Sequence, residues 1–136
     1  MSCKSAIYTA NATNATVTTT AGTFVQIPFG SVIRRYGQSL GLDGGSILCC
    51  NEGYFDVEAS LTYTPTAAGP VTIEFRQDGV AVPGLTASAT GTAASPMNLK
   101  VSGLVRNCRG CCNSTLTAWV NAPGNITNFA TVVEKQ

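Results

Sequence analysis

Apolar and polar residues alternate along the segment GYFDVEASLTY, residues 53–63. The apolar positions on one face are Phe55, Val57, Ala59, Leu61 and Tyr63. The other face carries Tyr54, Asp56, Glu58, Ser60 and Thr62. Because successive side chains of a β-strand point to opposite faces, this period of two predicts a strand that buries one face and leaves the other for solvent or a neighbouring subunit.

The segment PVTIEFRQDG, residues 70–79, repeats the alternation. Val71, Ile73 and Phe75 are expected to point inward. The outward positions are Thr72, Glu74 and Arg76. The pair Glu74 and Arg76 is interpreted as an exposed ion pair of little energetic weight. Asp78-Gly79 then predicts a tight turn, because glycine tolerates a positive φ and aspartate caps the turn locally.

Shorter segments with strand composition follow one another along the rest of the chain. Further strands are predicted at residues 6–10, 15–19, 23–28, 31–36, 47–50, 80–82, 97–106, 116–121 and 128–134. The segments TPTAAGP, ATGTAASP and NAPGN are interpreted as loops because of their Pro, Gly and Asn residues. No helix of useful length is predicted. Many short strands with turn signals roughly every 8–12 residues are typical of a sandwich or jelly roll, and no linker divides residues 1–136, so one domain is expected.

Composition agrees with an all-β fold and excludes several classes of function. Thr, Ala, Gly, Val and Asn dominate, which favours sheets over helices. Charged residues make up 11% of the chain and the net charge is +1, too little and too balanced for binding nucleic acid or an anionic membrane. No stretch approaches the ~18–20 apolar residues of a membrane span. The start MSCKSAIYTANAT lacks the apolar region of a secretory signal. No cofactor is expected.

The order of the segments resembles a known family. SAIYTANAT, GYFDVEASLTY, VTIEFRQDGVAVPG, NLKVSGLVR and TNFATVVEK together look like the jelly-roll domain of the C1q and tumour-necrosis-factor superfamily, over nearly the whole chain. The most specific element is Gly53-x-Phe55-x-Val57, where the family has Gly-x-aromatic-x-apolar opening a central strand. Within that group the chain is most similar to small bacterial and phage members, including the C-terminal domain of spore-surface collagen-like glycoproteins and phage fibre or head-decoration proteins.

This resemblance implies a ten-strand, two-sheet jelly-roll sandwich that assembles as a homotrimer and acts as a binding or structural protein, not as an enzyme. Two pairs of consecutive apolar residues agree with an oligomer: Leu104-Val105 and Val132-Val133. In a strand the two members of each pair point to opposite faces, so one fills the sandwich and the other needs cover. That cover is either a neighbouring subunit or a loop of the same chain.

Six cysteines stand in a chain that has no histidine. They are Cys3, Cys49, Cys50, Cys108, Cys111 and Cys112. The resemblance places all of them at one end of the sandwich, close to both chain termini. Three readings stay open. The cysteines form disulfides that lock the trimer within or between subunits. Cys108, Cys111 and Cys112 ligate a metal, although no second CxxC or histidine completes a zinc site. Alternatively, the thiols are free and partly buried.

Few other residues suggest chemistry. Asp56 and Glu58 share a strand face, as a glycosidase pair would, but an exposed or subunit-facing strand explains them better. Trp119 and Tyr36 are candidates for stacking on a sugar ring, with packing at a sheet surface as the simpler explanation.

The leading hypothesis is a trimeric structural protein without enzymatic activity. It would be a phage decoration, fibre or spike component, or a bacterial surface protein, with the cysteines locking or mounting the trimer. Its expected partners are copies of itself and a phage capsid, a phage tail or a bacterial surface scaffold. Its expected location is the virion or the bacterial cell or spore surface, without a signal peptide. The alternative is a carbohydrate-binding module that uses Trp119, Tyr36 and surface loops to bind a cell-surface glycan.

Overall fold

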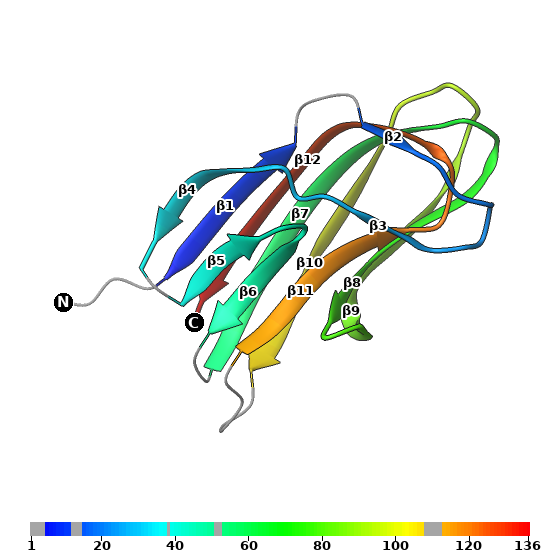
Figure 1. Cartoon of the computed structure of the whole chain (residues 1–136). Coiled ribbons are helices and arrows are strands. Elements are labelled where there is room, and N and C mark those ends of the chain that lie inside the picture. The colour runs from blue at the N-terminus through cyan, green and yellow to red at the C-terminus, as the bar shows by residue number, and fades with distance from the viewer. Residues whose placement is uncertain (1–4, 12–14, 38, 51–52, 108–112) are drawn as a thin grey trace.

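Two antiparallel sheets stack face to face in the computed structural model, which describes residues 5–11, 15–37, 39–50, 53–107 and 113–136 (Figure 1). Sheet A has the order β10 (Met97–Asn107), β7 (Gly53–Pro65), β12 (Gly124–Lys135), β1 (Ala6–Asn11), β4 (Ser31–Tyr36), and β2 (Ala15–Val17) pairs with β12. Sheet B has the order β5 (Leu40–Asp43), β6 (Ser46–Cys50), β11 (Asn113–Val120), β8 (Gly69–Gln77), β9 (Val80–Gly91), and β3 (Val25–Ile27) pairs with β11.

The prediction of an all-β, two-sheet jelly roll is confirmed. Each sheet has a continuous path of five strands, which together give the ten strands that the resemblance implied. The short strands β2 and β3 bring the total in the described part of the chain to twelve. Within the described ranges no helix is long and apolar enough to cross a membrane.

Alternating side chains of both sheets fill the space between them. The five inward residues predicted for β7 and the three predicted for β8 are all buried. At the centre, Phe29, Phe75 and Phe129 contact one another, with ring centroids 5.6 to 6.3 Å apart. Each such ring contributes about 1.5–3 kcal/mol through its removal from water. This packing fixes which face of each strand is turned inward.

Strand β9 is much longer than the predicted 80–82. From the sequence, the strand was predicted to end before Pro83-Gly84, and residues 89–91 were predicted to be loop. The structure continues the strand to Gly91. The register with β8 shifts between Glu74 and Arg76, so Pro83 and Gly84 lie in a bulge, and Gly84 has a φ of +89°. A bulge accommodates a proline and a glycine without ending the strand, which corrects the prediction.

Strand β5 was not predicted at all. It pairs with β6 in a hairpin whose two loop residues are Gly44 and Gly45, between the paired residues Asp43 and Ser46. Four residues with one fully buried side chain, Leu40, give too short a pattern for a period-two signal.

Four strand ends meet at one end of the sandwich, which we call the cysteine pole. Here Gly53 pairs with Asn107, and Cys50 pairs with Asn113. The backbone N–H of Lys135 donates to the carbonyl of Ser5 (2.8 Å), so both described ends of the chain lie at this pole (Figure 1).

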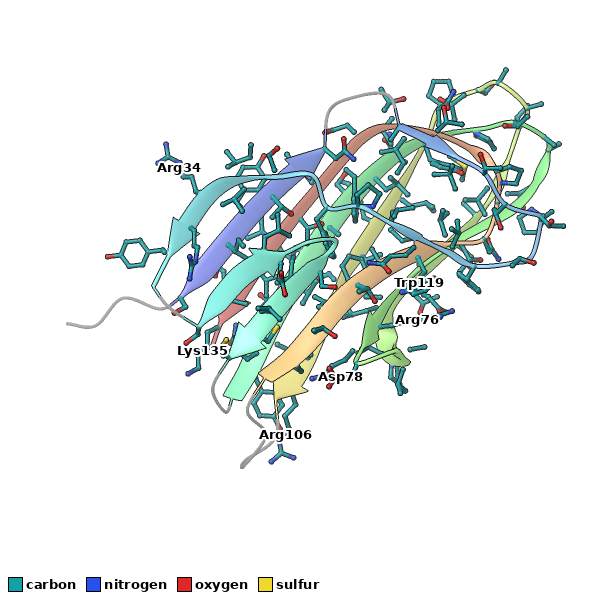
Figure 2. All side chains as sticks on the ribbon, viewed as in Figure 1. Arg34, Arg76, Asp78, Arg106, Trp119 and Lys135 are labelled. Carbon is teal, nitrogen blue, oxygen red and sulfur yellow. The ribbon has the colours of Figure 1, made fainter. Side chains whose placement is uncertain are left out.

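The opposite end, the far pole, is formed by the loops 66–68, 92–96 and 121–123. Backbone hydrogen bonds tie these loops to one another and to neighbouring strands: Ala94 N to Pro65 O (2.9 Å) and Thr66 N to Pro123 O (3.0 Å). Residues 59–73, 79–99 and 113–133, which form this pole and the strands leading to it, contain no Asp, Glu, Lys or Arg. The labelled charged residues Arg106 and Lys135 lie well away from these loops (Figure 2).

Gly124 begins β12 where the far pole is tightest. A Cβ added there would clash with the backbone oxygen of Thr64 and lie 2.9 Å from Cα of Pro65. Backbone cannot move aside as a flexible side chain can, so Gly124→Ala is expected to lower the free energy of unfolding by about 1–3 kcal/mol. Urea denaturation measures this change.

Gly41→Ala is the matched control for Gly124→Ala. Its added Cβ meets only the Arg35 side chain, at 3.9 Å, so its effect is expected within about 0.5 kcal/mol of zero. Equal effects of the two substitutions would contradict the tight backbone approach at Gly124.

Candidate functional site

Exposed large hydrophobic side chains gather on one sheet. Among the described residues seven are exposed, and six of them belong to strands of sheet A: Tyr8, Val32, Ile33, Tyr36, Tyr54 and Leu104. The seventh, Val80, begins β9. Single exposed apolar residues are normal on a protein surface, but a cluster on one face marks an interaction surface. Val32 pairs with the buried Thr9 and therefore lies on the inward side of the edge strand, whereas the other five residues share the outward face. The outward face of sheet A is therefore the candidate site.

The strand register aligns five side chains in a row across this face. Arg34 pairs with Tyr8, Tyr8 with Val132, Val132 with Glu58, and Glu58 with Ser102. Val132 is half-buried on this face, whereas its neighbour Val133 is fully buried in the core. Leu104 and Val105 divide in the same way, because Leu104 is exposed and Val105 is buried. The two residues of each consecutive apolar pair thus point to opposite faces of the sheet, as predicted.

A β-bulge adds Ile33 to the face. In the pairing of β1 with β4, Tyr8 faces Arg34 and Thr9 faces Val32, which leaves Ile33 as an extra residue. A bulge of this kind re-aims a side chain, and Ile33 is 53% exposed beside Tyr8 and Arg34. Ile33 was not among the site residues predicted from the sequence. The available signal was that Val32 and Ile33 are consecutive apolar residues.

Two hollows lie on this face, one on each side of Tyr8 and Val132. One hollow, of about 490 Å³, lies against Ala6, Ile33 and Tyr36 at the β4 edge. Another, of about 430 Å³, lies against Ser60 and Ala130. Tyr8 and Val132 line both hollows and separate them. The face is thus shaped to receive protruding side chains.

Three carboxylates stand together in the middle of this face. Asp56 lies directly across from Glu134 in the register, and Glu58 lies across from Val132. All three carboxylates line a further hollow of about 210 Å³. Like charges directly opposite each other in a sheet are destabilising. In the described ranges the only ion pair is Glu74 with Arg76, so none of the three carboxylates forms an ion pair with a described cation. Lys100 lines the neighbouring hollow together with Glu58.

The two described cysteines, at the cysteine pole, lie on opposite faces of β6. Cys49 points into the core and is 1% exposed, whereas Cys50 is half-buried on the other face of β6. Burial raises the pKa of the Cys49 thiol from 9.0 to about 12. The neighbouring Cys50 and Asp78 add to the rise, and a hydrogen bond with Ser114 opposes it.

The other four cysteines, Cys3, Cys108, Cys111 and Cys112, lie outside the described residues. The described residues Ser5, Asn107 and Asn113 lie at the cysteine pole, and the expected grouping of all six cysteines there stays a prediction. The readings as disulfide, metal ligand and free thiol all stay predictions. Among the described residues, no group of three or more His, Cys, Asp or Glu side chains is placed to hold a metal ion.

Trp119 and Tyr36 are not brought together. Trp119 lies on β11 of sheet B, and Tyr36 lies on β4 of sheet A. The guanidinium carbon of Arg76 lies 4.2 Å from the centre of the Trp119 ring, so it covers a ring face on which a sugar would stack (Figure 2). Arg76 also pairs with Glu74 at 2.6 Å, and their side chains are only 24% and 13% exposed. This pair is less exposed than the sequence analysis expected.

The burial of Cys49 predicts selective labelling of the thiols. In reduced, folded protein at pH 8, iodoacetamide is expected to modify Cys50 and leave Cys49 unmodified, because the thiolate is the nucleophile and the Cys49 thiol stays protonated and covered. In urea both residues are expected to react, as peptide mass spectrometry would show. Rapid labelling of Cys49 in the folded protein would contradict its placement in the core.

Alkaline pH is expected to destabilise the fold. Burial also raises the pKa of Tyr63, from 10.0 to about 12, and its hydroxyl donates to the carbonyl of Ala122. Above pH 9 for Cys49 and above pH 10 for Tyr63, the unfolded chain releases a proton that the folded chain keeps. Stability is therefore full below pH 9 and falls toward pH 12, by up to about 1.4 kcal/mol per pH unit and per group.

Urea denaturation of reduced protein between pH 7 and pH 11 measures this slope. Cys49→Ala and Tyr63→Phe each remove one of the two groups, so each variant should lose less stability between pH 7 and pH 11 than the wild type does. Parallel curves for all three proteins would show that neither group carries the pH dependence.

The fold of this chain is similar to the folds of several solved structures. No family model matches the chain, and no curated protein matches it in sequence. Among solved structures, murine APRIL has a TM-score of 0.74 at 8% identity, covering 97% of this chain and 99% of that chain. PRD1 vertex protein P5 has a TM-score of 0.69 at 11% identity, covering 96% of each chain. The globular domain of zebrafish complement 1qA has a TM-score of 0.66 at 8% identity, covering 96% of this chain and 95% of that chain. The chain therefore shares the jelly-roll fold of these proteins.

Proposed function

We propose that this protein is a non-enzymatic structural and interaction protein that assembles as a homotrimer through the outward face of sheet A. The observation that carries the proposal is the gathering of five exposed large hydrophobic residues, Tyr8, Ile33, Tyr36, Tyr54 and Leu104, on the outward face of this one sheet. A neighbouring copy that covers this face removes that apolar surface from water, which is the main favourable term in most associations between proteins.

The trimer is mounted on a phage particle or on a bacterial surface. The cysteine pole, which holds both described ends of the chain, is the locking or mounting end, and disulfides there reinforce the assembly. The far pole, without charged residues, then points away from the mount. The fold shared with PRD1 vertex protein P5 supports a virion component, although at 11% identity it is a likeness of fold.

The sugar-binding alternative has less support. Arg76 lies against the Trp119 ring at 4.2 Å, and Tyr36 belongs to the other sheet, so the two aromatic residues do not form one platform within a chain. Asp56 and Glu58 share a face as predicted, but they stand on the open surface that the trimer covers. For this reason we assign them no catalytic role.

The mass of the protein in solution tests the assembly. Light scattering after size exclusion should give about 42 kDa, three times the 14.0 kDa of one chain, both with and without reductant. Ile33→Asp places a charge on the apolar face without touching the core, so this variant should remain folded and fall to 14.0 kDa.

Ala68→Asp is the matched control, because Ala68 is exposed in a far-pole loop, and this variant should remain trimeric. A wild-type mass of 14.0 kDa in both conditions would refute the trimer. A trimer that dissociates only when reductant is added would show that the cysteines, and not the sheet face, hold it together.

A further inference from the structure

Opposite charges stand at separate positions in the row that crosses sheet A. Arg34 lies on the edge strand β4, and Glu58 lies on β7, with Tyr8 and Val132 between them. Three steps between neighbouring strands at ~4.8 Å each put the two backbones about 14 Å apart. Two apolar side chains fill the interval, and no ion pair between Arg34 and Glu58 is present. The face therefore carries a positive edge and a negative centre that do not neutralise each other within one chain.

Arg34 is the cation at the β4 edge of this face that is free to reach another molecule, whereas the exposed Lys100 already lies beside Glu58 in its own chain. Its neighbour Arg35 is engaged, because Nε of Arg35 donates to the carbonyl of Leu40 at 2.7 Å. The guanidinium carbon of Arg106 lies 5.9 Å from the centre of the Tyr54 ring. Arg106 belongs to β10, which is the edge strand at the other end of sheet A from β4. Arg34 is exposed, and it makes no hydrogen bond or ion pair with a described residue. A guanidinium keeps its charge at all relevant pH values and binds carboxylates through two parallel hydrogen bonds.

A closed ring of identical copies uses two different patches of each copy, one against each neighbour. We infer that the exposed β4 edge of one copy meets the centre of sheet A in the next copy, where Arg34 pairs with Glu58 and its neighbouring carboxylates. This inference rests on the proposed homotrimer and deepens it, because it names the contact that sets the direction of the ring.

The arrangement accounts for the carboxylate group as well. Asp56 and Glu134 repel each other across the strands of a single chain, and an incoming guanidinium offsets this repulsion. Apolar side chains of the β4 edge exclude water from the pair, which strengthens it relative to an exposed ion pair. Charges placed in this way contribute to the orientation and specificity of association more than to its total free energy.

A charge swap tests the pairing. Arg34→Glu and Glu58→Arg, each alone, place like charges against each other in every contact of the ring. Each variant should raise at least tenfold the protein concentration at which half of the trimer dissociates, as sedimentation velocity over a dilution series would measure. The double variant R34E/E58R restores opposite charges in every contact, and it should return to within about threefold of the wild type.

Asp43→Lys is the control for reversing a charge elsewhere, because Asp43 is exposed at the β5–β6 hairpin of sheet B. It should leave the dissociation unchanged. Circular dichroism of each variant shows whether the chain has folded. If a single variant does not fold, Arg34→Gln replaces it, and dissociation of the wild-type trimer should in addition increase between 50 mM and 500 mM salt.

The possible results separate the two proposals. A wild-type chain that is monomeric at all concentrations refutes the homotrimer itself. A stable trimer that neither single variant weakens refutes the pairing and leaves the homotrimer standing. Single variants that weaken the trimer without recovery in R34E/E58R also refute the pairing, because the two charges would then act on different contacts.

Discussion

The contact of Phe29, Phe75 and Phe129 between the sheets determines which face of each sheet is buried and which face is exposed. Once Phe75 and Phe129 fix the inward faces of β8 and β12, the period of two sends every alternate side chain of these strands outward. A two-sheet sandwich can bury only one face of each sheet. Sheet B covers its outward aromatic residue within the chain, through the contact of Arg76 with Trp119. Sheet A leaves its apolar residues exposed, so its second face has the character of an interface.

Much of this fold can be predicted from sequence because the long strands have strong alternation. Strand β7 has an unbroken period of two, and its predicted inward residues are the buried ones. The prediction failed where strands deviate from regular pairing. Pro83-Gly84 looks like a turn in sequence, yet a bulge accommodates it within β9. Strand β5 has four residues, and its place depends on pairing with β6 and not on a local signal.

The candidate site was only partly predictable, because a row of side chains across a sheet depends on register. The pairs Leu104-Val105 and Val132-Val133 indicated that one face needs cover, and both divide as expected. The alignment of Arg34, Tyr8 and Glu58 comes from three separate strand pairings and leaves no trace in the order of residues. Likewise, nothing in the adjacent letters of Cys49 and Cys50 tells which thiol is buried, since a shift of one residue would exchange them.

The far pole is separate from the row of side chains on sheet A and from the cysteine pole. The loops of the far pole contribute no residue to either of these features. Loop 92–96 is exposed along its whole length. In the proposed trimer, substitutions or insertions in this loop would alter the exposed far-pole surface without altering the contacts between copies. Under that proposal, the far-pole loops could vary in sequence while the contacts between copies stay the same. The same separation makes the loop a suitable place to graft a foreign peptide for display.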